Sequence, residues 1–216
     1  MSKSDILARI RNSLIDVTQD DPVLDVPVDW QYGQATAVAE PIELFIERVI
    51  DYKATVVRAA SEKDVPRLVA EGLAQAQATS LVVPAGVDPA WVAQAAQAGV
   101  ELVQDDPPLS HQRLNEISAV ITASVVGMAE TGTIALDHRG DQGRRELSLV
   151  PDMHVCVIRT DQIVTDVPQA MARLAPSLRQ HQPVTWISGP SATSDIELSR
   201  VEGVHGPRTL HVIVVG

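Results

Sequence analysis

The sequence contains one cysteine, Cys156, among its 216 residues. A single thiol cannot form a disulfide within the chain, and it cannot supply the several thiolates that hold an iron–sulfur cluster. The closest approach to a metal-binding group is Asp137, His138, Asp152 and His154, but their spacing matches no zinc pattern, and a solvated loop explains them better. We therefore expect this chain alone to bind no metal ion and no iron–sulfur cluster. Cys156 alternates within an apolar run, which predicts a core position.

Aromatic residues and positive charge are also scarce. Phe, Trp and Tyr make up 3% of the residues, and 28 acidic residues outnumber 17 Lys and Arg residues, giving a formal net charge of −11. Proteins that bind single-stranded nucleic acid stack bases on aromatic side chains and hold phosphates with Lys and Arg. The composition therefore excludes nucleic acid as an expected partner, and an acidic surface disfavours anionic membranes.

Long apolar runs are missing too. No stretch approaches the roughly 18 consecutive apolar residues of a transmembrane helix. The first residues, MSKSDILARIRNSL, lack the continuous apolar segment of a signal peptide. We therefore expect a cytoplasmic protein with no membrane insertion.

The N-terminal region, residues 1–40, is predicted to be a helix followed by an extended arm. Apolar residues recur at helical spacing over residues 4–16, with Ser4 as the expected N-cap. Residues 17–40 carry two prolines and show little periodicity. Such an arm either packs across the main domain or reaches a partner. We expect a docking element, because the apolar face of the helix needs a surface to cover it. That face consists of Ile6, Leu7, Ile10 and Leu14.

Residues 41–216 alternate between helical and strand patterns, and 45% of the whole chain is hydrophobic, which is enough for one substantial core. We expect helices over residues 41–53, 61–78, 88–98, 109–116 and 168–179, and strands over residues 54–60, 80–85, 100–104, 117–123, 133–138, 154–160, 184–187 and 209–215. This alternation predicts an α/β fold with a mostly parallel open sheet and helices on both faces. Residues 139–152 are too few for a regular crossover helix, so we expect a local antiparallel excursion there.

A polar, glycine-rich segment, residues 188–207, lies between the last two apolar runs, which we expect to be buried strands. Open α/β sheets bind ligands in a crevice at the strand ends, so this segment is the predicted binding site. The N–H groups of a helix that starts after Gly189 would bind a small carboxylate or phosphate. The hydroxyls of Ser191 and Thr193 would add donors, and Arg208 would complete the clamp.

Each part of this site has a plainer alternative. Ser194 and Glu197 can form a capping box, an arrangement that needs no ligand. Arg208 can form an ion pair with Glu202. Asp195 would repel an anion, so we expect it to orient a hydroxyl or a histidine.

Two further side chains are candidates for catalysis. Glu130 lies in a turn between two predicted strands, where a carboxylate acts as a nucleophile or general base; the alternative is a surface glutamate. His205 lies between Gly203 and Gly206, and it either exchanges protons near neutral pH or completes a tight turn. We expect the turns at Gly189 and Gly206 to open on the same crevice.

Four motifs, MAETGTIAL, HVCVI, GPSATSDIE and GVHGP, occur in this order before the final apolar run. In this combination they resemble the lactate-utilisation (LUD) domain family, and its C-type branch most, over residues 41–216. The resemblance implies a fold of the type shared by glucosamine-phosphate deaminase, ribose-phosphate isomerase and CoA transferases. It also implies one subunit of a system that oxidises L-lactate to pyruvate, with two cysteine-rich partners that carry the iron–sulfur clusters.

The resemblance leaves two functions open. The chain is a subunit that binds substrate or docks the iron–sulfur partners, or it is a stand-alone transferase or isomerase-like enzyme that acts on an acyl-CoA or phosphosugar. In CoA transferases of this fold a glutamate is the nucleophile, so Glu130 is the candidate for the second function by analogy.

Overall fold

The computed structural model describes residues 2–17, 21, 33–193, 201–202 and 206–216. The chain divides into two compact units, Met1–Gln34 and Ala35–Gly216. Among the described residues, no helix combines the length and apolar character that crossing a membrane requires.

The first unit contains helix α1, Lys3–Ser13. Its N-cap is Ser2, which forms a capping box with Asp5: the Asp5 N–H donates to Ser2 Oγ at 3.2 Å, and the Ser2 N–H donates to Asp5 Oδ2 at 2.8 Å. The expected cap at Ser4 is therefore wrong, because only Ser2 has an acidic partner three residues further on that completes the box. The apolar side chains expected on one face of this helix are 39% to 54% exposed: Ile6, Leu7, Ile10 and Leu14.

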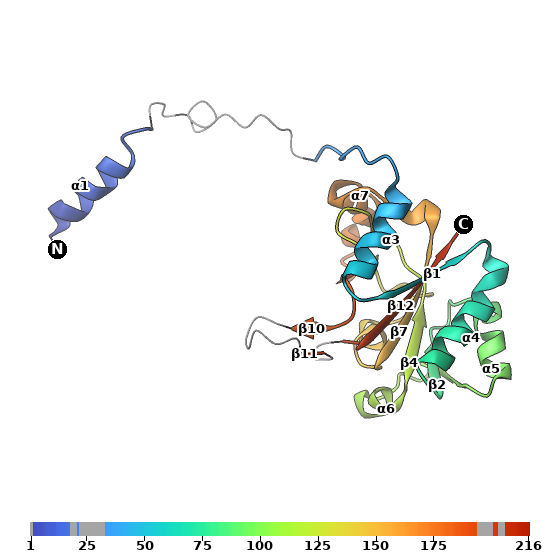
Figure 1. Cartoon of the computed structure of the whole chain (residues 1–216). Coiled ribbons are helices and arrows are strands. Elements are labelled where there is room, and N and C mark those ends of the chain that lie inside the picture. Colours follow the sequence, from blue (N-terminus) through green and yellow to red (C-terminus); the bar gives the residue numbers. More distant parts are fainter. Residues whose placement is uncertain (1, 18–20, 22–32, 194–200, 203–205) are drawn as a thin grey trace. The chain divides into compact units, whose positions relative to one another are not determined.

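The second unit is built on a sheet of six parallel strands in the order β1-β12-β7-β4-β2-β3. The strands are β1 Thr55–Ala59, β2 Ser80–Val83, β3 Glu101–Gln104, β4 Ala119–Thr122, β7 Met153–Arg159 and β12 Thr209–Val215. The central strands β4, β7 and β12 are buried along nearly their whole length, which is why their sequences are continuous apolar runs. The predicted parallel sheet is confirmed (Figure 1).

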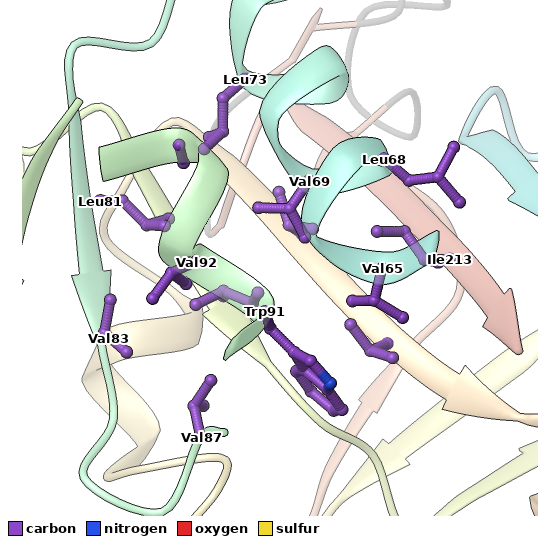
Figure 2. Packing of buried hydrophobic residues seen from close by; sticks show 14 of the residues in the cluster. Val65, Leu68, Val69, Leu73, Leu81, Val83, Val87, Trp91, Val92 and Ile213 are labelled. Atoms are coloured by element: carbon purple, nitrogen blue, oxygen red, sulfur yellow. The ribbon is translucent and has the colours of Figure 1, made fainter. Parts of the chain in front are cut away.

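Helices α4 (Val65–Gln75) and α5 (Pro89–Gln97) cover one face of this sheet. Figure 2 shows Val69 and Leu73 of α4 and Trp91 of α5 packed among side chains of β2 and β12. The helix expected over residues 61–78 begins as a short 3-10 turn, η1 (Glu62–Asp64), with the predicted Ser61–Asp64 capping box.

The opposite face carries α3 (Pro41–Asp51), α6 (His111–Glu116) and a second sheet. The second sheet has the order β8-β5-β6-β9. Its strands are β5 Val126–Met128, β6 Thr133–Leu136, β8 Ile163–Val164 and β9 Thr185–Ile187. Helix α7 (Val167–Arg179) packs on the far side of it. The prediction of helices on both faces is confirmed, with this small sheet added between the main sheet and α7.

The antiparallel excursion takes the form of this second sheet. Strand β6 pairs antiparallel with β5 and β9, whereas β7 belongs to the main sheet. Residues 139–152 connect the two sheets and include η2 (Arg145–Ser148). The expectation that β9 is a buried strand is wrong. It is the last strand of its sheet, and Trp186 is 42% exposed.

Candidate functional site

A cavity of about 240 Å³ lies beside the glycine-rich segment that the sequence singles out. Its described lining comprises residues 148–149, His154 of β7, residues 185–192, residues 206–207 and Leu210 of β12. None of these residues is charged, and serine, threonine and histidine side chains supply the polar groups. Such a lining favours a small neutral or singly charged ligand, because each unpaired buried charge is costly.

Gly189 lies in a tight turn in the wall of this cavity. Its φ of +80° is a backbone conformation that favours glycine. A Cβ atom there would lie 2.5 Å from Tyr52 Cβ, so the turn packs directly on the residue that ends α3. Further along, the Ser191 N–H donates to the Pro207 carbonyl at 2.8 Å and joins the two glycine-rich stretches. Gly206 lines the same cavity as Gly189, so the prediction that both glycine turns open on one crevice is confirmed.

The cavity lies at the carboxyl end of β9 but at the amino ends of two strands in the main sheet. His154 and Leu210 are the second residues of β7 and β12. The expectation of a crevice at the end of a buried strand of the main sheet is therefore wrong. The physical reason is that β9 belongs to the second sheet, so the chain that leaves it returns to the start of β12.

The described backbone after Gly189 ends in a short strand. Ala192–Thr193 forms β10, which pairs antiparallel with β11, Val201–Glu202. The helix start expected with Ser194 as its cap lies outside the described residues, and the two residues before it form an antiparallel ladder. Their N–H groups therefore supply no helix N-terminus for an anion.

His154 is a buried side chain of the lining. The strand expected over residues 154–160 is confirmed as β7, but the sequence also grouped His154 with residues that a solvated loop explains better. That assignment is wrong: His154 is 1% exposed, and its Nε2 atom lies 2.7 Å from Thr122 Oγ1 of β4. Burial, with a smaller contribution from nearby His138, lowers the pKa of His154 to about 4, so the ring is neutral at physiological pH. The alternation of HVCVI, which points His154 and Cys156 to the same face, is the signal that could have placed it.

Polar contacts behind the lining tie it to the rest of the second sheet. The Nε2 atom of His138 lies 2.7 Å from Thr185 Oγ1, and its Nδ1 atom lies 3.2 Å from the Gly143 carbonyl. Ser188 Oγ lies 2.8 Å from Thr133 Oγ1. Thr133 belongs to the MAETGT motif, so this motif reaches the cavity through a hydroxyl pair.

The family comparison agrees with the motifs. The model of the LUD domain matches residues 42–215. This chain belongs to the LUD domain family. It is 49% identical over 178 residues to a Deinococcus radiodurans protein named lactate utilization protein C, a match that covers 82% of this chain and 81% of the relative. A protein of the same name from Oceanobacillus iheyensis is 26% identical over 167 residues, with 72% of this chain and 71% of the relative covered.

A solved structure supports the fold of this LUD domain. The crystal structure of a DUF162 family protein from Deinococcus radiodurans is 41% identical to this chain, with a TM-score of 0.71. The superposition covers 84% of this chain and 99% of that chain. Together with the observed sheets, it confirms the α/β fold class.

Two of the predicted site residues of the LUD domain lie away from this cavity. Glu130 is exposed and lines a separate hollow with Arg48 and Tyr52, and its backbone N–H donates to the Thr165 carbonyl. Arg208 lies 3.6 Å from Asp152 in an exposed ion pair and lines another cavity, beside the end of α4. The structure therefore brings Gly189 and Ser191 together, but it brings neither Glu130 nor Arg208 to the lining beside them.

The remaining predicted residues cannot be placed. Thr193 is positioned only as backbone in β10, and Asp195, Glu197 and His205 lie outside the described residues, as does Ser194 of the alternative capping box. Within the ranges that the structure describes, no three His, Cys, Asp or Glu side chains are grouped so that they could hold a metal ion. Cys156 is buried in the core as expected, and burial raises the pKa of its thiol to about 12.

Proposed function

We propose that this LUD-domain chain serves in lactate utilisation, as a subunit of an iron–sulfur-dependent system that oxidises L-lactate. In this role it binds a small carboxylate, the substrate or its product, in the cavity beside Gly189 and Ser191. Two cysteine-rich partner proteins carry the iron–sulfur clusters and the electrons. The names of the relatives support the process, and the cavity supports the ligand class.

The uncharged lining is the observation that carries the ligand class. Acyl-CoA and phosphosugars are multiply charged, and proteins hold their phosphates with Arg, Lys or helix N-termini. The described lining contains none of these, and the backbone at Ala192–Thr193 is a strand. A small monocarboxylate therefore fits this cavity better than the substrates of a stand-alone transferase or isomerase.

Helix α1 is the docking element of this proposal. Its apolar side chains Ile6, Leu7, Ile10 and Leu14 are substantially exposed within their own unit. A partner subunit that covers them would remove apolar surface from water, which stabilises a complex by about 25 cal/mol for each Å² buried. The helix thus gives the system a point of attachment for a partner subunit.

Reconstitution tests the proposal. L-lactate-dependent reduction of an electron-accepting dye is measured with the two cysteine-rich partners, with and without this chain. We expect oxidation to require the chain. Ser191→Phe, which places bulk beside Gly206 in the cavity, should abolish most of the activity, whereas Gln97→Phe on the exposed surface of α5 should not.

Two outcomes would overturn this function. Equal oxidation rates with and without the chain would remove it from the lactate system. Turnover of an acyl-CoA or phosphosugar by the chain alone, without its partners, would favour the stand-alone enzyme.

A further inference from the structure

One lining residue of the cavity, His154, belongs to a polar pair that the predicted site did not include. His154 on β7 and Thr122 on β4 lie on neighbouring parallel strands, with Nε2 and Oγ1 2.7 Å apart. Both side chains are buried, His154 to 1% and Thr122 to 0% exposure. A polar ring of this kind is costly to bury unless its atoms have partners, and His154 also lines the cavity.

The two ring nitrogens of a neutral histidine have opposite roles, one donating and one accepting. If the Thr122 hydroxyl donates to Nε2, then Nδ1 carries the hydrogen and can donate to a ligand. If Nε2 donates to Thr122, then Nδ1 is an acceptor. The direction of the hydrogen bond with Thr122 is therefore linked to the tautomer of His154, and the tautomer decides what the ring offers to the cavity.

We propose that His154 is the hydrogen-bond donor that binds the carboxylate of a small 2-hydroxy or 2-oxo acid, and that Thr122 is the positioning residue that keeps its imidazole in the donating tautomer. This inference rests on the proposed function and names the residue that recognises its ligand. The carboxylate accepts from Nδ1–H, and Nε2 accepts from the Thr122 hydroxyl. The apolar wall formed by Leu149 and Leu210 receives the short carbon chain.

The neutral state of His154 matches this role. Burial holds the pKa of the ring low, so the cavity recognises its ligand by a directed hydrogen bond rather than by a permanent positive charge. A singly charged carboxylate is less costly to desolvate than a dianionic phosphate, which would need cations that the described lining does not provide. The pair thus selects monocarboxylates against inorganic phosphate.

A second buried histidine provides a matched control. His211 of β12 is 4% exposed, and its Nε2 atom has no partner among the residues that the structure describes. Its register partner on the neighbouring strand is Val155, so it faces the opposite side of the sheet, where it packs against Gly72 of α4. His211 does not line the cavity, so its replacement reports on loss of a buried imidazole alone.

The test uses the full chain with ¹⁵N-labelled histidine, titrated separately with L-lactate, pyruvate and inorganic phosphate. His154→Leu assigns the ring signals, and we expect L-lactate or pyruvate to shift those of His154 saturably and phosphate to leave them unchanged. His154→Leu should weaken affinity about tenfold, as for loss of one charge-assisted hydrogen bond, and His211→Leu should leave it unchanged. Melting temperatures confirm that both variants are folded.

Thr122 is tested by a pair of conservative changes. Thr122→Val keeps the shape of the side chain and loses the hydroxyl, so the ¹⁵N shifts of His154 should change to the other tautomer and affinity should fall about fivefold. Thr122→Ser should restore both. If Thr122 has only a structural role, Thr122→Val should leave the ¹⁵N signals of the His154 tautomer unchanged, and Thr122→Ser should then have no change to restore.

Several results would overturn the inference. They are His154 signals that stay unchanged up to about 50 mM L-lactate and pyruvate, an unaltered affinity in His154→Leu, and a saturable response of His154 to phosphate. The proposed function is tested apart from these. If reconstituted lactate oxidation requires the chain but proceeds normally with His154→Leu, the function stands and this inference fails.

Discussion

The two edges of the main sheet differ in a way that decides where a ligand can bind. At the carboxyl edge, the chain runs from β2 out to β3 and back to β4, the reversal that usually opens a ligand crevice. Residues 139–143 fill this place: the Gly86 N–H donates to the Gly140 carbonyl at 2.9 Å, and the Ala123 N–H donates to the Asp141 carbonyl at 3.0 Å. A hollow of about 180 Å³ remains beside them.

The amino edge is arranged differently. At the starts of β7 and β12, the segment that follows β9 lines the cavity of about 240 Å³. Strand order therefore marks the place of a crevice, but the crevice stays open only where no other segment of the chain fills that place. In this LUD domain the second sheet supplies both the segment that fills one edge and the segment that lines the cavity at the other.

The largest expected effect tests how tightly the carboxyl edge is closed. A Cβ atom at Gly86 would lie 2.5 Å from Asp141 N, with the Gly140 carbonyl carbon closer still. Because both neighbours are backbone, Gly86→Ala should lower the free energy of unfolding by about 3 kcal/mol or more. The melting temperature should fall by about 6 to 12 °C.

Gly140→Ala is the matched control for this edge. A Cβ atom there meets nothing closer than Gly86 Cα at 3.8 Å, so we expect a change in melting temperature within about 2 °C. Equal behaviour of the two variants would show that residues 139–143 do not pack on the carboxyl edge.

The second prediction concerns pH and the amino edge. The pKa of His154 is lowered to about 4 in the folded chain, so below the ordinary histidine value the unfolded state binds more protons. Stability should therefore fall as the pH decreases from about 6.5 to about 4, by up to roughly 3 kcal/mol from this residue. Urea unfolding from pH 7 to pH 4 should show a flatter dependence in His154→Leu. If the free energy of unfolding depends on pH in the same way in the unchanged chain and in His154→Leu, His154 is solvated.

The third prediction tests the turn that lines the cavity. Gly189→Ala should cost about 2 kcal/mol, from the strain of its positive φ and from overlap with Tyr52. Gly206→Ala, where a Cβ atom would make an ordinary 3.4 Å contact with Ser191, should cost far less. Chemical denaturation of both variants measures the difference, and equal losses would contradict the described turn.

The smallest effect concerns Arg208. Its ion pair with Asp152 is exposed, so Arg208→Ala should change stability by less than about 0.5 kcal/mol. The affinity for L-lactate should also remain the same, because Arg208 lines a different cavity. A marked loss of affinity would restore the predicted clamp and extend the binding site along the amino edge.

Much of the fold can be predicted from the sequence because its signals are local. Continuous apolar runs identify β7 and β12, and Asp88 before Pro89 marks the start of α5, where the Asp88 carboxylate accepts from the Ala90 N–H. Gly189 and Gly206 lie next to the two apolar runs that flank residues 188–207, and this position in the sequence predicts that they share one crevice. The alternation of HVCVI indicates which face His154 occupies, but its pairing with Thr122 has no local signal, because Thr122 lies on another strand and 32 positions away.

The amino-acid sequence alone establishes the α/β class, the parallel core and the position of the glycine turns, since burial periodicity and backbone conformation depend on near neighbours. One cysteine and few basic residues also limit the chemistry that is open to the chain. The three-dimensional arrangement adds that β9 and β12 belong to different sheets, that residues 139–143 fill the carboxyl edge and that His154 lines the cavity. Those facts depend on contacts between residues far apart in the chain, and no local pattern encodes which distant partner a strand or a side chain finds.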